Sequence, residues 1–250
     1  MEAVNIHLNH YKSTFNALRE IYGKDANIQE GYLRLQQDLT SGQPSFDLSV
    51  VADSRVPSSR ISEYLTTNDN FYVCGMSIAV FKKQTLLGTF DRSGNAPLFY
   101  YPDKTAFPYD PTPATNVAEY EALEAIWNGK YKIMSDTSEL IYEAPLSRFR
   151  AAPVIQDTAA TQPSSGQFHQ DFIQQVYNPF IFEGKKQTNI TVTFAPNADL
   201  TYIAGDPTVG TNHFVLFAYG WRIRNMSEAL TIKEAQAIAQ GRISNGKLYL

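Results

Sequence analysis

The clearest pattern of apolar and polar positions is at residues 213–225, "HFVLFAYGWRIRN". Its first half is apolar at nearly every position, and its last residues alternate, with Trp221 and Ile223 on one parity and Arg222 and Arg224 on the other. Successive side chains of a strand point to opposite faces. The stretch therefore predicts a central strand that is buried on both faces. We expect a facing sheet on one side and a helix, the N-terminal segment or a neighbouring subunit on the other, with the two arginines emerging where that cover ends.

Other stretches are rich in β-branched or aromatic residues and are bounded by turn-forming residues, which predicts further strands. They are residues 46–51, 70–82, 86–90, 97–101, 130–136, 138–144 and 188–195. Within the last of them, "TNITVTF" places Ile190, Val192 and Phe194 on one parity and Thr191 and Thr193 on the other. This alternation is typical of a half-buried antiparallel strand.

The N-terminal region shows helical spacing instead. In residues 7–22 the apolar stripe consists of Leu8, Tyr11, Phe15, Leu18 and Ile21, with Gly23 placed to end the helix. In residues 27–39 it consists of Ile28, Tyr32, Leu35 and Leu39, before "TSGQPS" breaks the pattern. We therefore expect a helical arm over residues 1–42. It either packs on its own domain or docks on a neighbouring copy.

The rest of the chain predicts one main domain over residues 43–226. Short helices are expected at "NVAEYEALEAIWNG" and, in a C-terminal segment over 227–250, at "TIKEAQAIAQG". Residues 145–187, which include the polar "QDTAATQPSSGQ", predict a long loop. About eight strands without βαβ alternation favour a mainly β fold. The expected architecture is an antiparallel β-sandwich of jelly-roll type, with an N-terminal helical arm and short peripheral helices.

Composition agrees with a β-rich fold, because aromatic residues make up 13% of the 250 residues and charged residues only 18%. The net charge of −4 and a pI near 5.6 give no reason to expect strong binding to nucleic acid or to an anionic membrane. Residues 1–45 carry four Lys/Arg against five Asp/Glu. We therefore expect no direct nucleic-acid binding through the N-terminal arm.

No signal-peptide pattern is present at the N-terminus, and no apolar run approaches the roughly 20 residues that cross a bilayer. The single cysteine, Cys74, excludes an intrachain disulfide framework and a cysteine-based zinc site. Its neighbours are apolar and β-forming, which predicts a buried and unreactive thiol. These features indicate a soluble protein made in a reducing compartment.

Catalytic and metal-binding motifs are absent from the sequence. The histidines are His7, His10, His169 and His213. His7 and His10 lie three residues apart in a predicted helix, where a solvated face is favoured over a metal site, and His169 lies near Asp171 in the predicted loop. No nucleophile elbow, phosphate-binding loop or dinucleotide fingerprint occurs. We therefore expect no enzymatic activity, no cofactor and no metal.

Charged clusters have simple interpretations. Glu119, Glu121 and Glu124 lie in a predicted helix, and a solvated helix face explains them. The lysine pairs at 82–83 and 185–186 flank strands, as charges that protect sheet edges or turns do.

Aromatic side chains are the candidates for contact with a partner. The loop "LFYYPDKTAFPYDP" is either a sugar-binding platform or a set of interface anchors. The candidate interface residues are Tyr11, Phe15, Leu18, Tyr100, Tyr101, Tyr109 and Trp221.

The order of features resembles a known group of proteins. A helical lead-in ends in "RLQQDLTSGQPSFDLSVV", a strand-rich middle is followed by "YNPFIFEGKKQTNITVTFAPN", and last comes "HFVLFAYGWRIRN". This layout, over most of residues 28–225, is similar to β-barrel virion proteins of bacteriophages, in particular capsid proteins of small tailless icosahedral phages with an internal membrane. Those proteins have two barrels per subunit, whereas this sequence has strands for about one.

The resemblance implies a self-assembling capsid (coat) subunit located in the virion and made in the host cytoplasm. Its partners would be copies of itself, in a trimer or a larger shell assembly, and other virion proteins or an internal membrane. The alternative is a β-sandwich binding module, such as a receptor-binding, tail or carbohydrate-recognising virion protein, with its contact site at residues 98–109. An enzyme on the same scaffold is a third alternative, which the sparse histidines disfavour.

Overall fold

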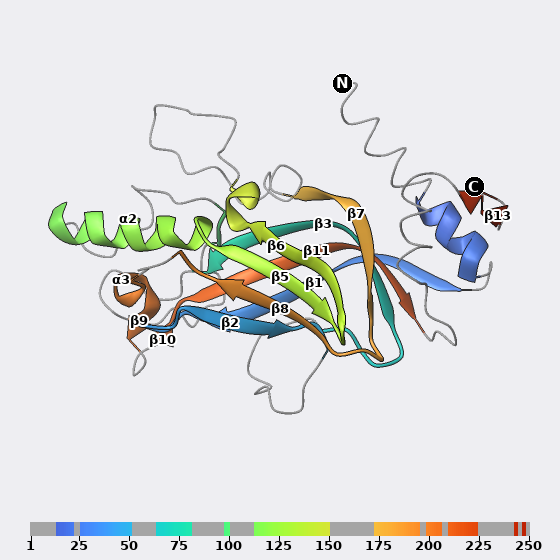
Figure 1. The fold of residues 1–250 in the computed structure, drawn as a ribbon, viewed down its shortest axis with the longest axis horizontal. Helices are drawn as coiled ribbons and strands as arrows, with labels where there is room; N and C mark the ends of the chain where they lie inside the picture. The colour runs from blue at the N-terminus through green and yellow to red at the C-terminus, as the bar shows by residue number, and fades with distance from the viewer. Residues whose placement is uncertain are drawn as a thin grey trace, which may run out of the picture.

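A computed structural model describes residues 14–22, 26–51, 64–81, 98–100, 113–150, 173–195, 199–206, 210–224, 243–244 and 247–248. The chain is mainly β, and two antiparallel sheets pack face to face (Figure 1). Sheet A has the order β1-β11-β3, and the far side of β3 pairs with both β7 and the short β4. Sheet B has the order β2-β8-β5-β6.

The bounds of the sheet strands follow the predicted stretches closely, with exceptions described below. In sheet A they are β1 (Asn27–Asp38), β11 (His213–Arg224), β3 (Asn70–Phe81), β7 (Gln174–Glu183) and β4 (Leu98–Phe99). In sheet B they are β2 (Ser45–Ser49), β8 (Thr188–Thr193), β5 (Lys130–Ser135) and β6 (Ser138–Pro145). The short pairs are β9 (Gly205–Asp206) with β10 (Gly210–Thr211), and β12 (Ile243–Ser244) with β13 (Lys247–Leu248).

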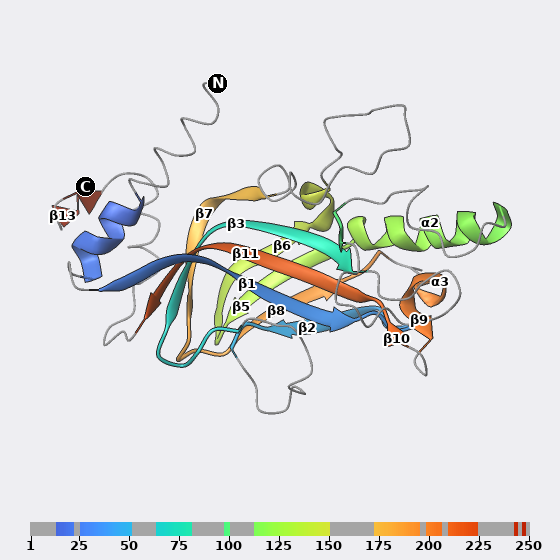
Figure 2. The same cartoon turned by 180° about the vertical axis from the view of Figure 1, so that it is seen from behind.

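The helices lie at the two ends of the sandwich (Figures 1 and 2). Residues 14–22 form a helix at one end, and α2 (Pro113–Trp127) and α3 (Thr201–Ala204) lie at the other. A 3₁₀ turn, η1 (Leu146–Phe149), follows β6. The helix predicted around residues 116–127 is confirmed, and Leu123, Ile126 and Trp127 bury its C-terminal half in the main core.

The main core fills the space between the two sheets. Every long strand contributes alternate side chains to it, as expected where two sheets pack face to face. Strand β8 shows the predicted alternation: Ile190, Val192 and the following Phe194 are buried, whereas Thr193 is exposed. The half-buried antiparallel strand at this position is therefore confirmed.

Strand β11 is central, as predicted, because it pairs with β1 on one side and with β3 on the other. Its even-numbered residues Phe214 and Leu216 face the main core, and its odd-numbered residues Val215 and Phe217 pack in a separate cluster on the outer face of sheet A. Arg222 lies at the end of the core face, where its Nη2 donates to the Tyr64 carbonyl oxygen at 3.4 Å.

The helix over residues 14–22 covers part of the outer face of sheet A. We call this region the helix-covered cluster; it consists of Ala17, Leu18, Tyr72, Ile181, Trp221 and Ile223, with Phe15, Ile21, Tyr22, Ile28 and Cys74 packed against it. Of the two alternatives for the N-terminal arm, these residues show packing on the chain's own sheet. Docking on a neighbouring copy stays a prediction.

The second predicted helix, residues 27–39, is wrong, because Asn27–Asp38 form β1. The strand belongs to the sandwich, so this part of the expected arm over 1–42 is not helical. Leu33 and Leu35, two residues apart, reach the main core, whereas Ile28 packs on the helix-covered cluster from the other face. Apolar residues on both faces of a strand reproduced a helical stripe by chance.

The long loop predicted over residues 145–187 is also wrong in part. It contains η1 and, at its end, the ten-residue strand β7. The strand includes Pro179, which donates no backbone hydrogen bond. Strand β7 pairs with β3 alone, and proline is tolerated on such edge strands.

Several predicted elements lie outside the described residues. They are the start of the first helix at 7–13, the strand at 86–90 and the helix at 231–241.

Asn212 joins three segments at the start of β11. Its side-chain Nδ2 donates to the Ile203 carbonyl at 2.8 Å, its backbone N–H donates to the Ala204 carbonyl at 3.0 Å, and its own carbonyl accepts from the Leu39 N–H at 2.8 Å. The residue is fully buried. The asparagine therefore fixes α3 against the ends of β1 and β11.

Replacing Asn212 by alanine is expected to lower the free energy of unfolding by about 2 kcal/mol, because the buried Ile203 carbonyl loses its donor. Urea denaturation followed by circular dichroism measures the change. Asn128→Ala, at an exposed position after α2, serves as the control and should change stability by about 0.5 kcal/mol at most. Equal effects of the two substitutions would contradict the role of Asn212.

Candidate functional site

Three of the candidate interface residues come together in the helix-covered cluster. The Phe15 and Trp221 rings lie 4.9 Å apart between centroids, and Leu18 is fully buried beside them. Arg19, one turn along the helix, places its guanidinium 5.7 Å from the Phe15 ring. The side chains are occupied by packing within the chain, and their role in an interface stays a prediction.

Tyr100 lies in a different cluster on the outer face of sheet A. It is buried against Ala79, Phe81, Val215 and Phe217. Burial raises the pKa of its hydroxyl well above the ordinary value. The three remaining candidates, Tyr11, Tyr101 and Tyr109, lie outside the described residues.

Arg34 of β1 lies beside the Tyr100 cluster and was not predicted as a functional residue. Its guanidinium carbon is 5.1 Å from the centroid of the Phe81 ring and 5.8 Å from that of Phe217. Its Nε and Nη2 atoms are buried and have no hydrogen-bond partner among the described residues. Tyr32, two residues earlier on the same face, is 43% exposed and packs edge-on to Phe217. Among the described residues, the contacts of this guanidinium are therefore mainly with aromatic rings.

At the end of the same sheet face, the fold places Asp38 of β1 opposite His213 of β11. The His213 Nδ1 and the Asp38 Oδ1 are 2.7 Å apart, and the imidazole stacks on the Phe81 ring. The contact fixes the orientation of the imidazole against β1. The two residues are 175 positions apart in the chain, so no local pattern could reveal the pair.

The remaining histidines, His7, His10 and His169, and Asp171 lie outside the described residues. In the ranges that the structure describes, no group of three or more His, Cys, Asp or Glu side chains is placed to hold a metal ion.

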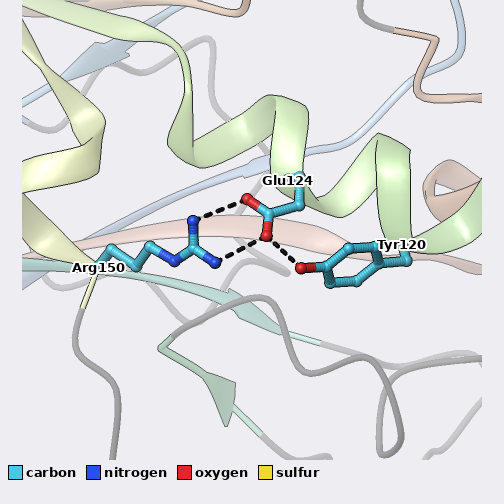
Figure 3. A network of polar contacts seen from close by, with 3 residues as sticks. All are labelled: Tyr120, Glu124 and Arg150. Carbon is cyan, nitrogen blue, oxygen red and sulfur yellow. Dashed lines mark hydrogen bonds and ion pairs between the residues drawn. The ribbon is translucent and has the colours of Figure 1, made fainter.

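Glu124 of α2 takes part in a contact that the sequence did not reveal (Figure 3). Arg150 donates to both of its carboxylate oxygens, from Nη1 at 2.9 Å and from Nη2 at 2.7 Å, and the Tyr120 hydroxyl donates to Oε1. The hydrogen bond raises the pKa of Tyr120. Glu121 is exposed, as predicted for a solvated helix face, whereas Glu124 ties α2 to the end of η1; the side chain of Glu119 lies outside the described part of the chain.

The outer face of sheet B is polar, in contrast to that of sheet A. Lys130 and Lys132 of β5 pair with Glu143 and Glu139 of β6 at 3.1 and 2.7 Å. Tyr142 on the edge strand β6 is 68% exposed, and the Lys132 Nζ lies 5.6 Å from its ring centroid. Sheet B thus presents a hydrated, charged surface.

The lysine pairs predicted at sheet edges are described only in part. Lys186, in the turn after β7, pairs with Glu183 at 2.6 Å, and Lys185 is exposed beside it. Residues 82–83 lie outside the described part of the chain.

No protein-family model matches the chain, and no curated protein matches it either. Among the described helices, none is long and apolar enough to span a membrane.

Proposed function

We propose that the β-sandwich of this chain has the jelly-roll topology. Numbered along the chain, the eight long strands are β1, β2, β3, β5, β6, β7, β8 and β11. The first pairs with the eighth, the second with the seventh, the third with the sixth and the fourth with the fifth. This is the pairing of one long antiparallel ribbon folded at its middle.

Two further pairings support the proposal, because they roll the ribbon into two sheets. β11 pairs with β3, and β5 pairs with β8. The resulting orders, β1-β11-β3-β7 and β2-β8-β5-β6, are those expected when a folded eight-stranded ribbon closes into two Greek keys.

We further propose that the protein is a self-assembling coat subunit of a bacteriophage virion. The strand pairing is the observation that carries this proposal, because jelly rolls are a common architecture of viral shells. The layout of the sequence, which is similar to phage β-barrel capsid proteins, points the same way. A shell subunit needs a rigid sandwich, and the core between the two sheets supplies one.

Self-association of the purified protein tests this function. We expect species much larger than the 28.1 kDa monomer in sedimentation velocity, rising with protein concentration, and closed symmetric particles or trimers in negative-stain microscopy. Circular dichroism should show a folded β protein in the same samples. A folded protein that stays monomeric at every concentration would refute the coat function.

A binding module of the virion is the second candidate. Tyr142 favours it, because an exposed ring on the polar face of sheet B, flanked by Lys132, suits stacking against a sugar. The contact site expected at residues 98–109 is less suitable where it is described, since Tyr100 is buried. A folded monomer that binds host-cell glycans would support this candidate over the first.

A further inference from the structure

In the described part of the chain, two nitrogens of the Arg34 guanidinium, Nε and Nη2, are buried without a hydrogen-bond partner. The side chain lies between the rings of Phe81 and Phe217 on the outer face of sheet A. Burial is the main influence on its pKa and lowers it, although an arginine remains charged at neutral pH. The guanidinium therefore keeps its positive charge while it is partly buried beside two aromatic rings.

Aromatic rings stabilise the charge of a guanidinium but do not accept the hydrogen bonds that its N–H groups donate in the guanidinium plane. A ring face attracts the positive charge, but guanidinium N–H groups lie in the guanidinium plane and need acceptors at its edge. Nε and Nη2, which form one side of the guanidinium fork, are buried and unpaired. An unpaired buried donor costs about 1–3 kcal/mol, and more when it is charged. An acceptor at this edge would therefore be strongly favoured.

The two polar residues that follow Arg34 on this face of β1, Gln36 and Asp38, do not supply that acceptor in the structure. Gln36, next on the same face of β1, is buried, and its Oε1 also has no hydrogen-bond partner. Asp38, the next residue on this face, is engaged by His213. On this face of β1, the Nε and Nη2 of Arg34 and the Oε1 of Gln36 are therefore buried and unpaired among the described residues.

We propose that Arg34 binds a carboxylate group side-on through Nε and Nη2, with Gln36 accepting a hydrogen bond from a donor adjacent to that carboxylate. A planar carboxylate matches the two parallel N–H groups of the fork. A phosphate would bring a larger charge and more acceptor oxygens than one arginine satisfies. Because Nε and Nη2 are covered in the structure, binding requires a neighbouring side chain to move aside; the partly exposed Tyr32, whose ring lies 6.1 Å from that of Phe217, is the side chain we expect to move.

The carboxylate has two sources with the same chemistry: a free organic acid, such as a sugar acid, or a side chain of a second copy. The proposal does not rest on the coat function, because the free-acid arm of the test needs no assembly.

The test for a free acid compares thermal unfolding of the protein in sodium acetate and in sodium chloride at equal ionic strength. We expect acetate to raise the melting temperature of the wild type by about 2–4 °C near saturation. Arg34→Met, which removes the fork, should abolish this rise, and Arg34→Lys, which keeps the charge, should reduce it strongly. Arg148→Met is the matched control, because Arg148 also lies over a ring, that of Phe149, and the acetate effect should persist in it.

The test for a second copy is sedimentation velocity of the same variants. Loss of association in Arg34→Met and Arg34→Lys, with association retained in Arg148→Met, would identify a carboxylate of a neighbouring copy. If Arg34→Met fails to fold, Arg34→Lys provides the comparison in both arms. The proposal is overturned if acetate affects wild type and Arg34 variants alike and their association is the same.

Discussion

Gly220→Ala is expected to leave the protein largely insoluble, or to lower its free energy of unfolding by about 3 kcal/mol or more. Gly220 lies in β11 opposite the bulge of β3, where the register shifts past Cys74. A Cβ atom there would overlap the Tyr72 carbonyl oxygen, with the carbonyl carbon at 3.0 Å and the Cys74 nitrogen at 3.1 Å. All three atoms are backbone, so no side-chain rotation relieves the overlap and the central strands must move apart.

The chain offers a closely matched control. Gly31 of β1 is the direct register partner of Gly220, and a Cβ atom built on it meets nothing within 4 Å. Gly31→Ala should therefore change stability by about 0.5 kcal/mol at most, or increase it slightly, because alanine restricts the unfolded chain. Soluble yield and urea denaturation of the two variants give the comparison. Equal stability of both would show that β3 adjusts freely and that the bulge is not a fixed feature.

Two kinds of strand could be predicted from the sequence: strands with one buried and one exposed face, and strands that are buried on both faces along most of their length. In β8 the alternation of Ile190 and Val192 with threonines correctly predicted which side chains face the core. In β11 the continuous apolar run followed by Arg222 correctly predicted a central strand that is buried along most of its length and becomes exposed at its end. Local pattern is sufficient in these strands because each side chain's surroundings depend mainly on which face it occupies.

Other strands could not be predicted, because their surroundings come from distant parts of the chain. Strand β1 mixes Leu33, which faces the core, with Ile28, which meets the helix over residues 14–22, and this mixture imitates a helical stripe. Strand β7 accepts Pro179 only because it lies at a sheet edge. Strand β3 is buried on both faces and has a bulge at Cys74. The position of the bulge could not be predicted from the apolar pattern of the strand itself.

The polar contacts of the candidate sites were less predictable than the strands. Asp38 and His213 meet through strand pairing across 175 positions, and Glu124 meets Arg150 across 26. Arg34 gave no signal in the sequence, since an arginine on an edge strand is ordinarily exposed. Its importance follows from the rings of Phe81 and Phe217, which the sheet brings from two other strands.

In the native protein, the Cys74 thiol is expected to react with a thiol reagent such as Ellman's reagent about a hundredfold or more slowly than in the unfolded chain at pH 8. Burial, followed by the nearby Glu30 carboxylate, raises its pKa to about 12. The reactive thiolate is therefore scarce at pH 8, whereas an unperturbed cysteine with a pKa near 8.5 is about a quarter ionised. Cys74 is the only cysteine, so the whole signal reports this one position. Equal labelling rates in buffer and in urea would contradict the prediction.

The same shift makes stability depend on alkaline pH. A pKa that is raised by folding means that the native state holds its proton where the unfolded chain has lost it. The resulting stabilisation is complete below the unfolded pKa and is lost as pH rises from about 8.5 towards 12. Between pH 8 and pH 10 we expect a loss of about 2 kcal/mol that Cys74→Ala does not show, because the roughly 1.5 pH units above the unfolded pKa are worth about 1.4 kcal/mol each. The buried Tyr72 beside it, whose pKa is also raised by burial, adds a further loss above pH 10 in both proteins. Urea denaturation at both pH values separates the two groups, and an identical pH dependence of wild type and Cys74→Ala would mean that the thiol has no such role.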